Sequence, residues 1–429
     1  MTVVAMICQA ILIASAVYGL YHVVIAWPIV GTLAAPAPRS QRTHRFAVLV
    51  FAKDEAAVIG QLLDSLRAQE YPDDAYEVFV TADNCTDDTA DLARRAGATV
   101  SERSDRTRIG KGYALTWFFE RFERAADFDA CVIFDADNLV DPGFLAAMNR
   151  QLNAGHPVAV GYRAGKNPSS SWISGSNTLF WLMQWRLFHL PRARRGLPIT
   201  SVGGTGFMFA LDVLGGRGWQ TSSACEDIEF TLRAILDGHQ VALAPDALFY
   251  DEQPLTFGQS MRQRYRWAVG SMQVLGLLGP DLLRAARADW RGRFDALMFA
   301  IGIPVAGVTG IAWVGLALAD AASTGDWAAL PWFLLASCVA GYLAIVAVSL
   351  LVLRLEHATW PRVWQTVAGF PIYLLSWSVL NIIVLFWRDP TWSAIPHTEA
   401  LSLDEVARPV DRDQRAAPAP APVPLETEA

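Results

Sequence analysis

The chain has 429 residues, a formal net charge of −7, 53% hydrophobic residues and 18% charged residues. This length allows about two or three domains, and the composition is apolar for a soluble enzyme, which indicates a membrane component. Binding to a nucleic-acid backbone normally needs a concentrated basic face, so the acidic balance argues against nucleic acid as a partner.

The N-terminal segment is the first predicted membrane span. Residues 3–33 contain no Asp, Glu, Lys or Arg, and this run exceeds the roughly 20 apolar residues that cross a bilayer. A signal peptide is the alternative, but the run is too long, no basic region precedes it and no small-residue cleavage site follows it. Arg39, Arg42 and Arg45 come next, so the positive-inside rule places the following residues in the cytosol and the N-terminus outside.

Residues 46–250 alternate short apolar stretches with helical patterns, which predicts an α/β layer fold with a largely parallel sheet. Strands are expected at 46–51, 76–81 and 130–134, and a helix at 53–66. Acidic residues follow these strands, at the edge where open α/β sheets bind ligands. A single Asp at such a point is most often a turn or cap residue, but together they predict a site.

The cysteines say little about this site. The five of them form no CxxC pair and no zinc-ligand spacing, which predicts neither a disulfide framework nor a structural metal site. A reducing cytosolic setting is the simplest one for the α/β region.

Three further apolar stretches, at about 295–319, 330–353 and 366–387, predict C-terminal membrane helices. Four arginines precede the first stretch, whereas Asp320 and Asp326 follow it without a basic residue, so this helix should leave the cytosol. The second helix should return, and a fourth full span would place the tail outside. Polar residues in the last stretch, among them Ser376 and Asn381, either make helix–helix hydrogen bonds or line a polar path.

Asp135-Ala136-Asp137, Glu226-Asp227 and Gln263-x-x-Arg266-Trp267 follow one another in a fixed order. With these motifs the chain resembles the membrane-embedded family 2 glycosyltransferases, which include cellulose, hyaluronan and poly-N-acetylglucosamine synthases. The resemblance covers about residues 45–275. It implies a GT-A type nucleotide-sugar-binding domain, with a Rossmann-like mixed sheet, inserted between transmembrane helices.

The resemblance also implies a donor site. Glu55 and Asp83 look like nucleoside contacts, and Asp135 like a contact to nucleotide or metal. Asp137 is similar to the metal ligand, which would hold Mg²⁺ or Mn²⁺, hard cations that prefer oxygen ligands. Lys111 is similar to a basic residue near the nucleotide, although a solvated loop lysine is equally compatible with the sequence.

On the acceptor side, Asp227 looks like the general base of an inverting transfer, with Glu226 beside it; a solvated helix start is the alternative. Gln263 and Arg266 resemble the diphosphate contacts, and Trp267 resembles the residue that stacks on the terminal acceptor sugar. A snorkelling interfacial helix with Arg262, Arg264 and Arg266 is the alternative. Gly204 and Thr205 resemble an acceptor-side loop, or else form a plain turn.

Departures from the family pattern limit the product. Cys225 stands where the family commonly has Thr, and the Cys-Gly-Ser of cellulose synthases is absent, so cellulose is not assigned. Trp392 and His397 resemble a tail motif that relatives keep on the cytosolic side, which conflicts with four full spans.

The predicted organisation follows from these segments. Residues 1–38 form the N-terminal anchor, 44–255 the cytosolic catalytic domain and 256–293 interface helices with the QxxRW motif. Residues 294–389 form the C-terminal membrane helices, and 390–429, rich in Pro, Ala, Asp and Glu, form a largely disordered tail. The protein is therefore expected to be a multi-pass protein of the cell membrane.

The predicted function is inverting, metal-dependent transfer from a nucleotide sugar, a UDP-sugar, to a growing β-linked polysaccharide. Transfer of one sugar to a lipid acceptor is the alternative, since lipid glucosyltransferases share the Arg-Trp motif. A polymer channel built from few spans would need a second copy or a secretion partner. A non-catalytic scaffold or transporter is disfavoured, because the base, metal and QxxRW positions are all intact.

Overall fold

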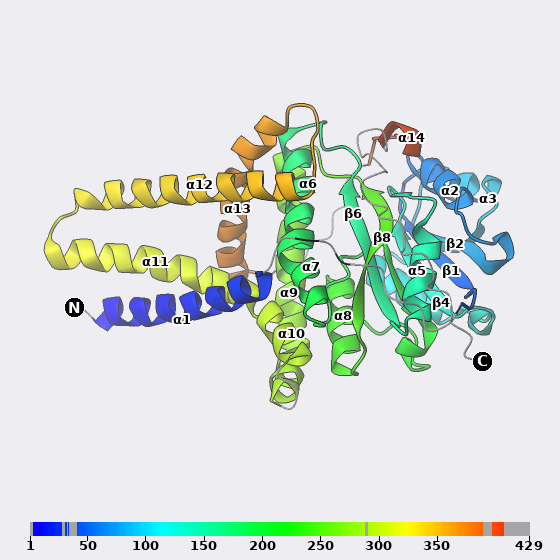
Figure 1. Ribbon diagram of the computed structural model, residues 1–429, viewed down its shortest axis with the longest axis horizontal. Coiled ribbons are helices and arrows are strands. Elements are labelled where there is room, and N and C mark those ends of the chain that lie inside the picture. The colour runs from blue at the N-terminus through cyan, green and yellow to red at the C-terminus, as the bar shows by residue number, and fades with distance from the viewer. Residues whose placement is uncertain are drawn as a thin grey trace, which may run out of the picture.

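The computed structural model describes residues 3–27, 31, 33, 41–287, 291–388 and 397–406. Figure 1 shows an α/β part at one end of the molecule and long helices that project away from it at the other end. A middle layer of helices lies between the two parts.

Eight strands of the described chain form one mixed sheet in the order β3-β2-β1-β4-β7-β6-β8-β5. Strands β3, β2, β1 and β4 pair in parallel, and β7 is antiparallel to both of its neighbours. The sheet is therefore less uniformly parallel than the sequence pattern predicts. The strands are β1 (Phe46–Ala52), β2 (Tyr76–Asp83), β3 (Thr99–Arg103), β4 (Ala130–Asp135), β5 (Leu139–Val140), β6 (Val158–Gly165), β7 (Phe207–Ala210) and β8 (Val241–Asp251).

The core lies on both faces of this sheet. All seven residues of β1 are buried, as expected for a parallel strand covered by helices on both sides. Leu49 belongs to the hydrophobic cluster on one face, whereas Val48 joins Leu62 and Leu66 on the other. The covering helices are α2 (Ile59–Arg67), α3 (Thr89–Arg95), α4 (Lys111–Phe119), α5 (Phe144–Asn153) and α8 (Glu226–Leu236).

Helix α2 starts later than the sequence predicts, at Ile59 rather than residue 53. Asp54 has a positive φ of 55°, a value that no α-helix contains. Its Oδ1 accepts the Thr86 N–H at 2.6 Å. The segment before α2 thus folds onto the loop that follows β2, and its polar residues stay at the sheet edge.

The middle layer connects the sheet to the projecting helices. It contains α6 (Trp172–Met183), a π-helical turn (Gln184–His189), α7 (Leu190–Arg194), α9 (Phe257–Ala286) and α10 (Gly292–Ala300). Buried ion pairs fasten this layer. Arg192 of α7 makes contacts of 2.7 and 3.0 Å with the carboxylate of Asp295 in α10, and Tyr21 donates to the same carboxylate at 2.7 Å.

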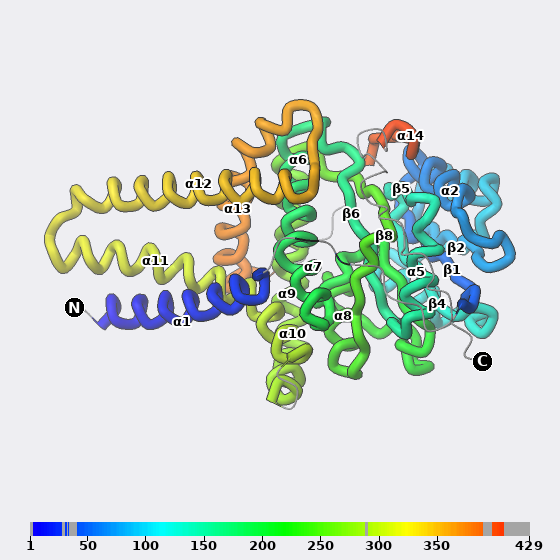
Figure 2. Tube along the Cα trace, viewed as in Figure 1, coloured from blue at the N-terminus to red at the C-terminus, as the bar shows by residue number. Residues whose placement is uncertain are grey.

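Four helices among the described residues are long and apolar enough to cross a membrane: α1 (Val3–Ala26), α11 (Gly302–Thr324), α12 (Ala329–Leu355) and α13 (Val363–Phe386). Figures 1 and 2 show α1, α11 and α12 projecting in the same direction, whereas α13 runs across them beside the middle layer. Arg264 of α9 fixes α13 there, because its Nη1 donates to Tyr373 O at 2.9 Å and to Ser376 Oγ at 2.7 Å.

Part of the tail folds against the α/β domain. The backbone N–H groups of Thr398 and Glu399 donate to Glu252 Oε1 at 2.9 and 3.3 Å, and residues 403–406 form the short helix α14 (Leu403–Val406). This segment falls in the region for which the sequence predicts disorder. Trp392 and residues 407–429 lie outside the described residues.

Candidate functional site

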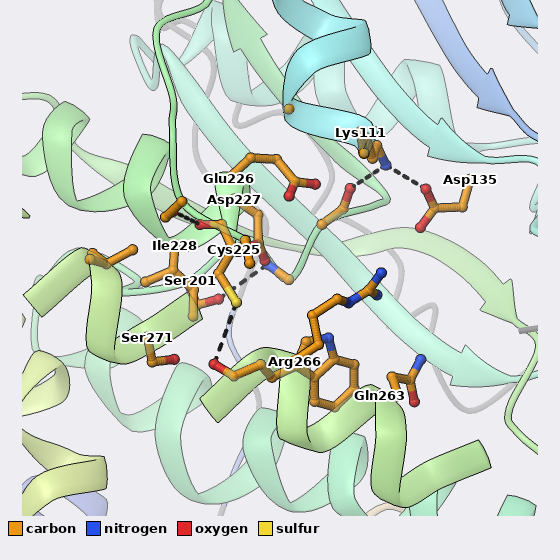
Figure 3. Close-up of a pocket in the computed structure, with 18 of the residues that line it drawn as sticks. Lys111, Asp135, Ser201, Cys225, Glu226, Asp227, Ile228, Gln263, Arg266 and Ser271 are labelled. Atoms are coloured by element: carbon orange, nitrogen blue, oxygen red, sulfur yellow. Dashed lines mark hydrogen bonds and ion pairs between the residues drawn. The ribbon is translucent and has the colours of Figure 1, made fainter. Parts of the chain in front are cut away.

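A cavity of about 890 Å³ opens at the carboxyl ends of the central strands and continues past α9. This volume is within the range of small-molecule sites. Figure 3 shows side chains from α4, β4, α8 and α9 around it. It is lined by all but one of the residues that the sequence predicts for the site: Glu55, Asp83, Lys111, Asp135, Asp137, Gly204, Glu226, Asp227, Gln263, Arg266 and Trp267.

The exception is Thr205, which is 1% exposed and does not line the cavity. Its Oγ1 accepts the backbone N–H of Asp135 at 2.9 Å and contacts Asn138 Oδ1. The predicted contact between this side chain and an acceptor is therefore not available. Thr205 instead orients the loop that carries Asp135.

Lys111 connects three parts of the site. As the first residue of α4 it contacts Asp135 Oδ1 and donates to Gly204 O at 2.8 Å (Figure 3). Its side chain is 17% exposed, so the solvated-loop alternative does not describe it. The ammonium group is held at the cavity wall, where it can meet an anionic ligand.

Asp137, at the end of the cavity formed by the sheet edge, has a strongly raised pKa. Burial raises its pKa to about 8, and the carboxylates of Asp251, Asp135 and Glu55 add to the effect, while His397 opposes it. A buried carboxylate among other acids holds its proton more tightly than a solvated one. Oxygen ligands in such a cluster fit a hard divalent cation such as Mg²⁺ or Mn²⁺.

His397 completes this cluster from the tail. Its Nδ1 lies 2.8 and 3.0 Å from the two carboxylate oxygens of Glu55, and its Nε2 lies 3.7 Å from Asp137 Oδ2. Burial alone would lower the pKa of His397, but Asp137 and Glu55 raise it to about 10. The tail motif drew attention to His397 in the sequence, but only the folded structure shows that it lies beside Glu55.

Asp83 at the end of β2 is held by a residue that the sequence analysis missed. Arg103 of β3 donates to Asp83 Oδ1 at 2.6 Å, and both side chains are almost fully buried. Burial raises the pKa of Asp83 despite this ion pair. The register of β2 and β3, which pairs Asp83 with Arg103, is what brings them together.

Glu226 and Asp227 occupy the first turn of α8 and point into the cavity (Figure 3). Burial, followed by repulsion from Asp227, raises the pKa of Glu226 to about 7, and burial also raises the pKa of Asp227. Raised pKa values at a cavity wall are typical of acid–base groups. Glu229 is the residue that fits a helix-start role, since it accepts the N–H groups of Ser222 and Ser223.

Helix α9 presents two different faces. Gln263 and Arg266 face the cavity (Figure 3), whereas Arg264 is fully buried against α13. The snorkelling alternative is therefore wrong for Arg264. Trp267 forms part of an aromatic wall, with its ring 5.7 Å from that of Trp181 and 6.4 Å from that of Trp377.

Arg163 and Asp251 are two further cavity residues that the sequence analysis missed. They lie near the ends of the parallel strands β6 and β8, with Arg163 Nη1 at 3.3 Å from Asp251 Oδ2. The guanidinium also stacks over the Trp181 ring at 3.9 Å. Arg163 could have been noticed only by extending the strand-end argument to β6.

Residues 44–270, more than half of the chain, match the family model described as glycosyltransferase like family 2. The chain belongs to this family. The expected membership of a glycosyltransferase family is thereby confirmed.

Two curated relatives of this glycosyltransferase align over much of the same region. The probable glycosyltransferase YdaM of Bacillus subtilis is 28% identical over 256 residues, which are 54% of this chain and 56% of the relative. A β-monoglucosyldiacylglycerol synthase of Nostoc is 30% identical over 269 residues, 59% of this chain and 54% of the relative. Poly-β-1,6-N-acetyl-D-glucosamine synthases of Staphylococcus aureus also match, at 25% over 238 residues. The chain thus spans about half the length of these relatives.

A solved structure extends the likeness beyond the catalytic region. The mannosyltransferase PcManGT of Pyrobaculum calidifontis, in complex with GDP-Man and Mn²⁺, has a TM-score of 0.60 and 21% identity, and the match covers 88% of this chain and 98% of that one. The expected GT-A fold is confirmed by this likeness together with the family match.

Proposed function

We propose that this glycosyltransferase transfers a sugar, with inversion, from a nucleotide diphosphate to a hydroxyl group of a membrane lipid. The observation that carries the proposal is the course of the cavity. It joins Asp137 and Asp227 at one end to side chains of the apolar helices α1, α11 and α13 at the other.

The donor would bind at the sheet edge. Asp137 and His397, with Asp135 nearby, are the groups that would hold Mg²⁺ or Mn²⁺, and such a cation neutralises charge on a leaving diphosphate. Arg266 offers a planar fork of N–H donors that suits phosphate oxygens, and Gln263 lies beside it on α9. A relative in fold was crystallised with Mn²⁺, which supports a divalent cation here.

Asp227 would act as the general base. It takes the proton of the acceptor hydroxyl while the hydroxyl oxygen bonds to the anomeric carbon. The bond from that carbon to the diphosphate breaks, and its electron pair leaves with the diphosphate. Attack on the face opposite the diphosphate converts an α-linked donor into a β-linked product. The raised pKa of Asp227 suits a base that works near neutral pH.

The helices favour a lipid acceptor over the polysaccharide that the sequence analysis placed first. In α12 only Ser349, Val352 and Leu353 are buried, all in the last two turns, and in α1 only Ala5 and Cys8. Figure 1 shows α12 well apart from α11 along most of its length. Three helices so widely exposed do not wall a passage for a polymer, which would require further helices from another chain.

The β-monoglucosyldiacylglycerol synthases among the relatives support the same choice. Polysaccharide synthesis is the second candidate. It is favoured by the aromatic wall of Trp181, Trp267 and Trp377, since flat indole faces suit sugar rings.

The direction of α13 supports a cytosolic catalytic domain. If α1, α11 and α12 cross the bilayer and α13 lies along its surface, the chain crosses three times and the tail returns to the side of the α/β domain. The contact between His397 and Glu55 supports this arrangement, because it needs the tail and the α/β domain to lie on the same side. Arg42 and Arg45 after α1 fit the cytosolic side of a multi-pass protein of the cell membrane.

The experiment uses the full chain in lipid nanodiscs with Mn²⁺ or Mg²⁺ and radiolabelled UDP- and GDP-sugars, followed by organic extraction. Label in one extractable lipid bearing a single sugar is the expected result. High-mass water-soluble product would support the polysaccharide candidate. Absence of turnover with every donor, in protein that binds nucleotide, would refute the proposal.

A further inference from the structure

The end of the cavity nearest α1, α11 and α13 contains buried polar atoms that have no hydrogen-bond partner among the described residues. This end is lined by Tyr18 and His22 of α1, Ile303 of α11, and Trp377 and Asn381 of α13. Asn381 Oδ1 and His22 Nε2 are buried and have no hydrogen-bond partner among the described residues. Buried polar groups almost always have a partner, so an unpartnered pair in one cavity calls for a ligand.

Tyr373 and Ser376 of α13 do not share this property, whereas the buried Trp377 Nε1 does. Ser376 accepts a hydrogen bond from Arg264, and Tyr373 donates from its hydroxyl to Asn177 Oδ1 at 3.1 Å. Helix–helix hydrogen bonding, one of the two explanations for polar residues in this segment, therefore accounts for Ser376. It does not account for Asn381.

The surroundings define the ligand's chemistry. An amide oxygen and an imidazole nitrogen both match a hydroxyl group, which donates and accepts hydrogen bonds. The Trp377 ring, stacked on Trp267 at 6.4 Å and 23°, gives this part of the cavity an aromatic wall. On the outer side of α13, Ile372, Leu375 and Val379 are about half exposed or more, at 54%, 60% and 48%, as suits contact with acyl chains.

We propose that Asn381 and His22 bind the hydroxyl-bearing headgroup of the lipid acceptor, which enters from the bilayer at the mouth formed by α1, α11 and α13. This inference rests on the proposed function. Asn381 is a positioning residue in this account. It holds the headgroup so that the reacting hydroxyl extends past the Trp267 wall to Asp227.

The test replaces Asn381 with leucine, which has a similar volume and no polar atoms. Ser378→Ala is the matched control, because Ser378 is an exposed residue of the same helix that does not line the cavity. For each variant in nanodiscs, the lipid acceptor is titrated at saturating donor and the donor at saturating lipid. Nucleotide binding and lipid-independent donor hydrolysis are measured in parallel.

The expected result is a rise of about 3- to 10-fold in KM for the lipid in Asn381→Leu, the effect of one neutral hydrogen bond. The donor KM, donor hydrolysis and nucleotide binding should match Ser378→Ala. An unchanged lipid KM would overturn the inference and leave the proposed function standing. Wild-type protein that hydrolyses donor but glycosylates no lipid would refute both.

A second variant covers the case in which Asn381→Leu no longer binds nucleotide and so has not folded correctly. Ile303→Trp places a large ring at the mouth of the cavity from a different helix. It should reduce transfer to lipid at least about 10-fold while donor hydrolysis persists, because a bulky ring excludes the headgroup but does not reach the donor end. Full transfer by Ile303→Trp would overturn the proposed entry route.

Discussion

Gly270 of α9 sets the position of the proposed base. A Cβ at this position would lie 2.5 Å from Cys225 Sγ, 2.7 Å from Cys225 N and 2.9 Å from Cys225 Cβ. Ordinary contacts between non-bonded heavy atoms are about 3.5–4.0 Å, so Gly270→Ala requires a separation of about 1 Å. Cys225 immediately precedes Glu226 and Asp227, so a displacement of Cys225 also moves the start of α8.

The magnitude follows from two opposing effects. Overpacking costs about 1–3 kcal/mol, whereas Ala gains about 0.8–1 kcal/mol over Gly in a helix, so we expect up to about 2 kcal/mol of net destabilisation. A misplacement of the base by about 1 Å should lower kcat about 100-fold. Gly276→Ala is the matched control on the same helix, because nothing lies within 4 Å of its Cβ.

The assay compares the initial rate of nucleotide diphosphate release and the thermal unfolding midpoint of both variants in nanodiscs. Gly270→Ala should lose rate and melt below Gly276→Ala, with donor KM nearly unchanged. If Gly270→Ala matched Gly276→Ala in rate and melting, the close approach of α9 to α8 would not position the base.

Three further predictions follow from the site and the middle layer. Asp227→Asn removes a negative charge beside Glu226, so the pKa of Glu226 should fall below about 7, measured by NMR titration of its carboxyl group; a pKa that stays in place would contradict the repulsion between the two acids. Asp295→Asn leaves the buried Arg192 without a counter-charge and should destabilise the fold by about 3–5 kcal/mol, measured by denaturation. His397→Ala should raise the Mn²⁺ concentration for half-maximal activity about 10- to 100-fold, measured by metal titration.

A matched control is available for Asp295→Asn. Asp281 makes an ion pair of 2.9 Å with Arg284 in which both side chains are more than half exposed, so Asp281→Asn should change stability by less than about 1 kcal/mol. If Asp281→Asn lowered the free energy of unfolding as much as Asp295→Asn, burial would not be the reason that the Arg192–Asp295 pair stabilises the fold. If His397→Ala needed the same Mn²⁺ concentration as the wild type, His397 would not be a ligand of the metal.

Much of the site could be predicted from sequence because strand ends carry it. Asp83, Asp135 and Asp137 come directly at or after buried strands, and the carboxyl ends of such strands meet at one edge. The QxxRW motif likewise predicts a cavity-facing helix. These features depend on residues that are close together in the chain, so they can be recognised without knowledge of the fold.

Other features depend on contacts between distant residues. Thr205 belongs to a glycine-rich loop that resembles an acceptor-side loop, but its hydroxyl accepts a hydrogen bond from the Asp135 backbone. The crosswise course of α13 depends on Arg264, whose buried contacts with Tyr373 and Ser376 span more than 100 residues. Hydropathy measures only length and composition, so it could not distinguish a fourth crossing from another course of this helix.

The central claim is tested most directly by Asp227→Asn, with Asp212→Asn as control, since Asp212 is exposed and outside the cavity. The measurement follows labelled sugar from donor to extractable lipid together with nucleotide binding. The account predicts at least about a 1,000-fold loss of transfer in Asp227→Asn with nucleotide binding intact, within the range attributed to a general base, and no loss in Asp212→Asn. Transfer by Asp227→Asn within about tenfold of the wild-type rate would contradict it.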